Sequence, residues 1–128
     1  MKQLFTLICL IFIKSAFAFD VIDDVATTFK SGDANAIAKY FSSTVELSII
    51  DKEDIYASNQ ATFILKDFFA KHPPISTKVI HKVTSNPSYK FGVILLTTSN
   101  ANYRVSFELK NNSSKFLISQ IRIEENKE

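Results

Sequence analysis

Apolar residues near the start of the chain recur at the spacing of an α-helix. From Val21 to Phe29 they fall three to four positions apart, which predicts an amphipathic helix with one buried stripe. Asp20 is suited to cap the start of this helix, because its carboxylate can accept a hydrogen bond from a free backbone N–H, and Gly32 is suited to end it. Asp33 then opens a second, short helix. Its inward-facing residues are expected to be Ala34, Ile37, Ala38 and Phe41.

A strand and a third helix follow. Apolar and polar residues alternate from Thr44 to Ile50, which predicts a strand with one buried side. The polar run 51–54 predicts a turn, and Ile55-Tyr56 predicts a short strand stub. Ser58 is expected to cap a third helix, which Pro73-Pro74 ends because proline cannot continue the helical hydrogen bonds. The buried stripe of this helix is expected to be Ala61, Ile64, Leu65, Phe68 and His72.

The second half of the chain has the pattern of four consecutive strands. Short, Asn-containing turns separate the apolar runs, as antiparallel hairpins require. The predicted strands are 76–85, 89–98, 103–110 and 115–124. In the third of them Tyr103 shares an inward phase with the apolar residues, whereas Arg104 and Glu108 take the opposite phase. Helices followed by an antiparallel meander predict a single α+β domain.

The first 18 residues have the pattern of a cleavable signal peptide. A basic start precedes the apolar run 4–13, and Ala16-Phe17-Ala18 matches the small-residue cleavage site. The run is shorter than the ~20 residues that a membrane span needs. Cleavage after Ala18 predicts a periplasmic or secreted domain over residues 19–128, with no transmembrane segment; an uncleaved N-terminal anchor is the alternative. The single cysteine, Cys9, would leave with the signal, so the mature domain has no disulfide.

Composition excludes several classes of function. Loss of Lys2 and Lys14 with the signal brings the charge of the mature domain close to zero, which argues against nucleic-acid binding. The chain has two histidines and two glycines, with no zinc-binding motif and no glycine-rich phosphate loop. We therefore expect no cofactor, no metal and no catalytic residue that a motif identifies.

The order of elements resembles the nuclear transport factor 2-like fold, also called cystatin-like, over essentially the whole mature chain. This resemblance implies three helices packed in the concave face of a strongly curved antiparallel sheet, forming a cone with a pocket. Two stretches, 20–32 and 64–74, resemble more closely a family of small exported Bacteroidetes proteins that share this fold. That family has no assigned function, so the resemblance leaves the function open.

His81 is the one residue with a candidate chemical role. It shares a strand phase with Val79 and Val83, whereas Lys78 and Lys82 take the other, so we expect it to point into the cone. There it would be a packed core residue, a ligand contact, or the base of a lyase or isomerase. The side chains expected to line a ligand cavity are Phe41, Tyr56, Phe63, His81 and Tyr103.

The predicted strand 89–98 is apolar on both faces, which implies an apolar patch on the outer sheet face together with Ile80. Burial in a homodimer, or under another segment of the chain, would cover this patch. The sequence therefore leaves two main hypotheses for the function. One is an exported, non-enzymatic module that holds a small apolar or amphipathic molecule in the cone. The alternative is a protein–protein interaction domain that acts through the outer sheet face.

Overall fold

The computed structural model describes residues 20–127 and forms three helices and six strands. Their order along the chain is α2 (Val21–Ser31), α3 (Ala34–Ala38), β1 (Phe41–Ile49), β2 (Lys52–Ala57), α4 (Ser58–Lys71), β3 (Pro74–Val83), β4 (Tyr89–Thr98), β5 (Asn102–Asn112) and β6 (Lys115–Glu125). The predicted signal peptide lies outside the described residues. Within 20–127, no helix has the length and apolar character needed to cross a membrane.

The predicted caps of the first two helices are confirmed. The Asp23 N–H donates to the Asp20 carboxylate at 3.0 Å, and Gly32 ends α2 in the left-handed conformation with φ 66°. Asp33 caps α3 in the same way as Asp20 caps α2. Phe41 was expected on the inner face of this short helix, but α3 ends at Ala38 and Phe41 opens β1, where it is buried as a strand residue.

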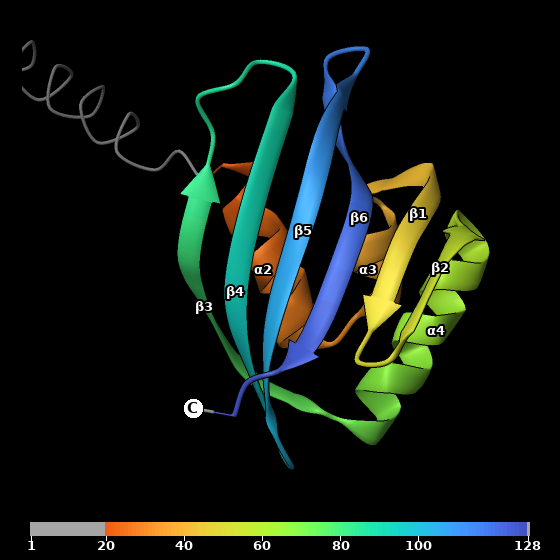
Figure 1. The fold of residues 1–128 in the computed structure, drawn as a ribbon, viewed down its shortest axis with the longest axis vertical. Helices are drawn as coiled ribbons and strands as arrows, with labels where there is room; N and C mark the ends of the chain where they lie inside the picture. Colours follow the sequence, from red (N-terminus) through yellow and green to blue (C-terminus); the bar gives the residue numbers. More distant parts are fainter. Residues whose placement is uncertain (1–19, 128) are drawn as a thin grey trace, which may run out of the picture.

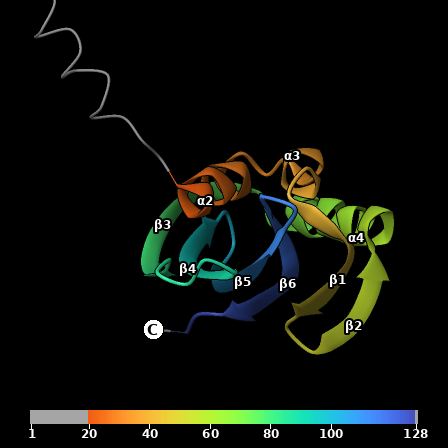
Figure 2. The same cartoon turned by 90° about the horizontal axis from the view of Figure 1, so that it is seen from above.

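The six strands form one curved sheet in the order β2-β1-β6-β5-β4-β3. Neighbouring strands are antiparallel except for β1 and β6, which run parallel, so the sheet is mixed at this one seam. The predicted stub at Ile55-Tyr56 is a full edge strand of six residues, because the turn before it is confined to Ile50 and Asp51. Seen from above, the sheet is an arc with α2, α3 and α4 on its concave side (Figures 1 and 2).

Aromatic side chains fill the space between the helices and the middle of the sheet. Phe29 of α2 stacks on Phe107 of β5 with 6.4 Å between ring centroids, and it meets Phe69 of α4 edge-on at 5.9 Å. Gly92 makes room for this packing: a Cβ at its position would lie 2.8 Å from Ile22 and 2.9 Å from Phe107. The centre of the cone is therefore packed core, which confirms the α+β class and moves the search for open space towards its ends.

A β-bulge in β3 overturns the expected orientation of His81. Val79 pairs with Ile94 but His81 pairs with Val93, so one extra residue of β3 is inserted between the two pairs. The strand phase reverses at that point. Lys82 consequently lies on the helix side and contacts the carboxylates that begin α2, whereas His81 is exposed on the outer face. The prediction that His81 points into the cone is wrong, because strict alternation cannot anticipate a bulge.

Candidate functional site

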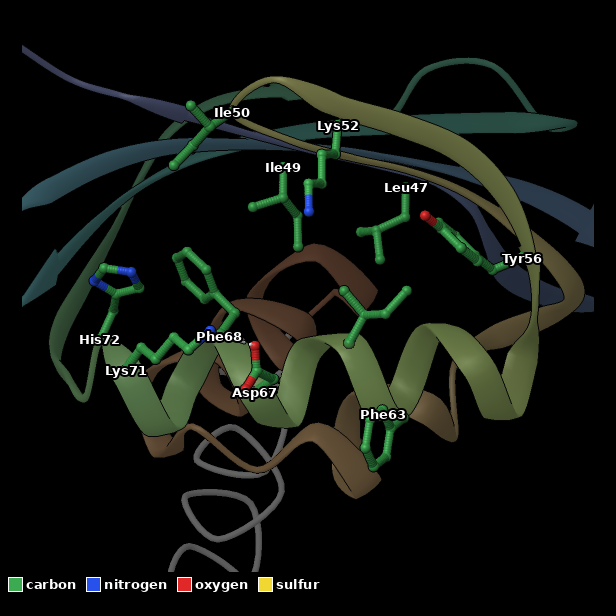
Figure 3. Close-up of a pocket in the computed structure, with 11 residues that line it drawn as sticks. Leu47, Ile49, Ile50, Lys52, Tyr56, Phe63, Asp67, Phe68, Lys71 and His72 are labelled. Carbon is green, nitrogen blue, oxygen red and sulfur yellow. Dashed lines mark ion pairs between the residues drawn. The ribbon is translucent and has the colours of Figure 1, made fainter.

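A cleft of about 410 Å³ opens between α4 and the end of the sheet formed by β1 and β2 (Figure 3). We refer to it as the α4 cleft. Its apolar wall comes from the inward phase of β1, with Leu47 and Ile49, and from the facing side of α4, with Ile64 and Phe68. The volume falls in the range of small-molecule pockets, ~300–1,000 Å³.

The local sequence explains why α4 presents this face. The predicted stripe runs at helical spacing through Ile64 and Phe68 to His72, and these three residues line the α4 cleft. The start of the helix differs from the prediction: Ala57 is the N-cap, and its N–H donates to the Gln60 side chain at 3.3 Å. Ser58 is instead the first helical residue. The helix ends before Pro73, as predicted.

Charged groups face each other across the α4 cleft. The Lys52 side chain points from β2 towards the helix and lies beside Ile49 (Figure 3). On α4, Lys71 forms an ion pair with Asp67 at 3.0 Å, with both side chains more than half exposed. Among residues 20–127, no carboxylate lies within 4.0 Å of the Lys52 ammonium. The cleft therefore has an apolar wall and one cation that the described residues leave unneutralised.

His72 closes one end of the cleft, and a network of hydrogen bonds fixes its ring. Asn100 donates from its side-chain amide to the Lys71 carbonyl at 3.1 Å, so its oxygen faces His72, 2.9 Å from Nδ1. An amide oxygen only accepts, which places the proton of the neutral ring on Nδ1. Nε2 is then the ring nitrogen left to accept a hydrogen bond from a ligand, and residues 20–127 supply it with no partner.

Tyr103 is a buried residue that contacts the His72 ring. Its hydroxyl lies 3.1 Å from His72 Nδ1, and its ring meets Phe68 edge-on with 5.2 Å between centroids. Burial, and secondarily the negative charge of Glu125, raises the pKa of Tyr103 above its ordinary value of 10.0. The hydroxyl consequently stays protonated at neutral pH and holds the imidazole without changing charge.

The rim of the α4 cleft contains a strained residue. Ile50 has a φ of 57°, in the left-handed region that β-branched side chains avoid, and its side chain is 50% exposed. Its backbone N–H donates to the Ile123 carbonyl at 2.9 Å, which holds the turn in place. Glycine or asparagine would fit this turn at lower cost. An exposed, strained isoleucine therefore lies where it lines the cleft.

The structure brings together some of the five predicted cavity residues. Tyr56 and Phe63 line the α4 cleft. Tyr103 is buried behind it and contacts two of its lining residues, His72 and Phe68. Phe41 belongs to the packed core, and His81 lies on the opposite face of the sheet, beside Arg104 and Glu124.

Sequence reasoning missed two residues of the cleft, Lys52 and Ile50. Lys52 was assigned to a turn, although it is the first residue of β2. Ile50 is expected from the sequence as the last residue of a strand, whereas the structure places it in the turn that lines the cleft. The stripe at Ile64, Phe68 and His72 was the signal that could have identified the helical wall. Within residues 20–127 there is no group of three or more histidine, cysteine or acidic side chains placed to hold a metal.

Comparison with known proteins identifies the family. A model described as a domain of unknown function, DUF4783, matches residues 22–124. The crystal structure of a DUF4783 family protein from Bacteroides uniformis is 29% identical, with a TM-score of 0.81, and the match covers 85% of this chain and 100% of that one. A second, from Bacteroides ovatus, is also 29% identical, with a TM-score of 0.79 over 86% of this chain and 97% of that one.

More distant structures share only the fold. A Nostoc punctiforme domain with a cystatin-like fold is 9% identical, with a TM-score of 0.64 over 80% of this chain and 70% of that one. Proteins named for NTF2 match at 14% and 16% identity with TM-scores of 0.62. No curated protein matches significantly. The fold is therefore nuclear transport factor 2-like, and the chain belongs to the DUF4783 family.

Proposed function

We propose that the protein is an exported, non-enzymatic binding module that holds a small amphipathic molecule in the α4 cleft. The observation that carries this proposal is the distribution of exposed apolar side chains. Of the large apolar side chains exposed within residues 20–127, Ile50, Ile55 and Phe63 all line the α4 cleft or the hollow that adjoins it; the other two are Ile75 and Ile80. Apolar side chains gathered at a concave site favour a ligand that covers them.

The strain at Ile50 supports the same site. A left-handed conformation costs a β-branched residue ~1–2 kcal/mol, and such strain collects at functional positions. The fixed ring of His72 adds an oriented hydrogen-bond acceptor at the end of the cleft. An apolar wall with a few oriented polar groups is the usual composition of a small-molecule site.

A neutral fluorescent probe tests this proposal directly. N-phenyl-1-naphthylamine emits strongly in apolar surroundings, and we expect it to bind the purified protein in the micromolar range. Ile64 lines both the α4 cleft and the adjoining hollow, so Ile64→Trp should fill the site and abolish the signal. Ile75→Trp, at an exposed position outside the cleft, is the matched control and should bind normally. Equal binding by both variants would reject the α4 cleft as the site.

The outer sheet face supports a second candidate function, a homodimer or other protein–protein contact. Phe91, Val93 and His81 surround a shallow hollow of about 180 Å³ there, and Ile80 is 40% exposed nearby. Arg104 and Glu124 border the same hollow, so the apolar area is small. Sedimentation velocity with wild type and Phe91→Glu tests it: a dimer that the substitution dissociates supports this candidate, and a monomer at high concentration removes it.

A further inference from the structure

The charged residues that line the α4 cleft indicate which chemical class of ligand would bind there. Lys52 enters from the sheet side without a carboxylate partner among residues 20–127, and Lys71 is balanced by Asp67 on the helix. The lining of the α4 cleft itself therefore carries one excess positive charge beside an apolar wall, and the carboxylate of Asp54 belongs to the adjoining hollow. A group with a single negative charge complements it, and Figure 3 shows the Lys52 ammonium beside the Ile49 side chain on the sheet side of the cleft.

Carboxylate fits this site better than phosphate. Phosphate groups are usually held by arginine forks or by several N–H donors at a helix N-terminus. No arginine lines the α4 cleft, and the lining residues of α4 extend to its C-terminal end at Lys71, where the helix dipole disfavours a dianion. A monoanion that contacts one lysine needs neither feature.

The volume of the cleft limits the size of the ligand. About 410 Å³ equals the volume of roughly 14 water molecules at ~30 Å³ each. A chain of about eight carbons with a terminal head group has a comparable number of non-hydrogen atoms. Its aliphatic part would lie on Leu47, Ile49 and Ile64, leaving the head group near Lys52.

We propose that the ligand of the α4 cleft is a medium-chain aliphatic carboxylate, selected through Lys52. This inference rests on the proposed function, because it assumes that the cleft is the binding site. It adds a head-group preference: at equal chain length the cleft binds the anion most tightly, the neutral alcohol less tightly and the cation least. Because the Lys52 side chain is exposed, the preference is about two- to five-fold, the range of an exposed ion pair.

Three ligands of equal chain length test the inference on the full protein. Octanoate, 1-octanol and octylammonium are titrated as competitors of N-phenyl-1-naphthylamine at low and high salt. We expect octanoate to compete at two- to five-fold lower concentration than octanol, and high salt to remove most of that difference. Octylammonium should be the weakest competitor.

Two substitutions should shift the octanoate affinity in opposite directions. Lys52→Gln removes the unpaired cation and should weaken octanoate binding two- to five-fold, whereas Asp67→Asn frees Lys71 and should strengthen it by a similar factor. Lys66→Gln, on the same helix but outside the cleft, is the control and should change nothing. Octanol binding should be the same in all of these proteins.

The possible outcomes separate the two proposals. Equal competition by octanoate and octanol, or tighter binding of octylammonium, overturns the head-group preference while the binding module stands. Octanoate affinity unchanged by Lys52→Gln also overturns it. If none of the three competes and the probe itself does not bind, the proposed function fails together with the inference.

Discussion

The ion cluster that joins β3 to α2 offers a direct test of the bulge that moves His81 out of the cone. Lys82 Nζ lies 3.0 Å from the Asp20 carboxylate and 2.9 Å from the Asp23 carboxylate. These contacts form only if the strand phase reverses before Lys82. Lys82→Met keeps much of the aliphatic stem and removes the charge, so it isolates the electrostatic part of the contact.

The expected magnitude follows from the exposure of the cluster. About a third of each side chain is exposed, so solvent screens both pairs, and each contributes ~0.2–1 kcal/mol. Both acids also lie at the N-terminal end of α2, where the helix dipole already favours them. We expect Lys82→Met to lower the free energy of unfolding by about 1 kcal/mol at neutral pH, or the melting temperature by about 4 °C.

The stabilisation that Lys82 provides through its ion pairs should depend on pH in a direction that the pKa shifts determine. Burial alone would raise the pKa of Asp20, but the hydrogen bond from the Asp23 N–H and the contact with Lys82 outweigh it and hold the pKa below the ordinary 3.8. The contacts with Asp23 and Asp20 raise the pKa of Lys82 above 10.5. The stabilisation is therefore complete between about pH 4 and pH 10, and it is lost as pH falls through the lowered value of Asp20 or rises through the raised value of Lys82.

Urea denaturation followed by circular dichroism measures this prediction. A double-mutant cycle of Lys82→Met with Asp20→Asn keeps a good helix cap while removing the charge, and it should give a coupling of ~0.5 kcal/mol at pH 7 that disappears near pH 2. Lys78→Met, on the same strand before the bulge and outside every described ion pair, is the control. A coupling of zero at pH 7, or an equal loss in the control, would refute the reversed phase.

Three further outcomes follow from the packing and the backbone. Gly92→Ala should destabilise the fold by ~1–3 kcal/mol in urea, because its Cβ would overlap Ile22 and Phe107; an unchanged midpoint would contradict the close approach. Ile50→Gly should stabilise the protein by about 1 kcal/mol yet weaken probe binding, a combination that a merely structural turn would not show. Tyr103→Phe should cost ~0.5–1.5 kcal/mol and broaden the imidazole proton signals of the histidine at the end of α4 in NMR spectra, since one of its two ring contacts is lost.

Structural features that depend on residues close together in the sequence could be predicted from the sequence alone. The Asp20 and Asp33 caps, the Gly32 terminator and the four-strand meander all depend on residues within a few positions, and the structure confirms them. Family resemblance added the packing of the helices against a curved sheet, which local pattern alone does not specify. The parallel pairing of β1 with β6 joins residues about 75 positions apart, and no local pattern indicates it.

The candidate site depends on long-range geometry, which is why the sequence alone did not indicate how its residues lie relative to one another. The bulge at β3 arises from how that strand pairs with β4, so the sequence of β3 alone could not reveal that His81 faces outward. Lys52 lies in a run of charged residues that is typical of a turn. The pairing of β2 with β1 is what brings it to the cleft. Tyr56 and Phe63 lie at the α4 cleft, because their neighbours in the sequence define the end of β2 and the first turns of α4.

The distribution of aromatic residues explains why open space occurs at one end of the molecule. Phe29, Phe69 and Phe107 occupy the volume between α2, α4 and the middle of the sheet, so a ligand cannot enter the centre of the cone without displacing packed core. Between α4 and the strands β1 and β2 the described residues leave about 410 Å³ unfilled. Leaving apolar walls beside water costs stability unless something covers them, and the strained Ile50 adds to that cost. A small amphipathic ligand in the α4 cleft would offset both.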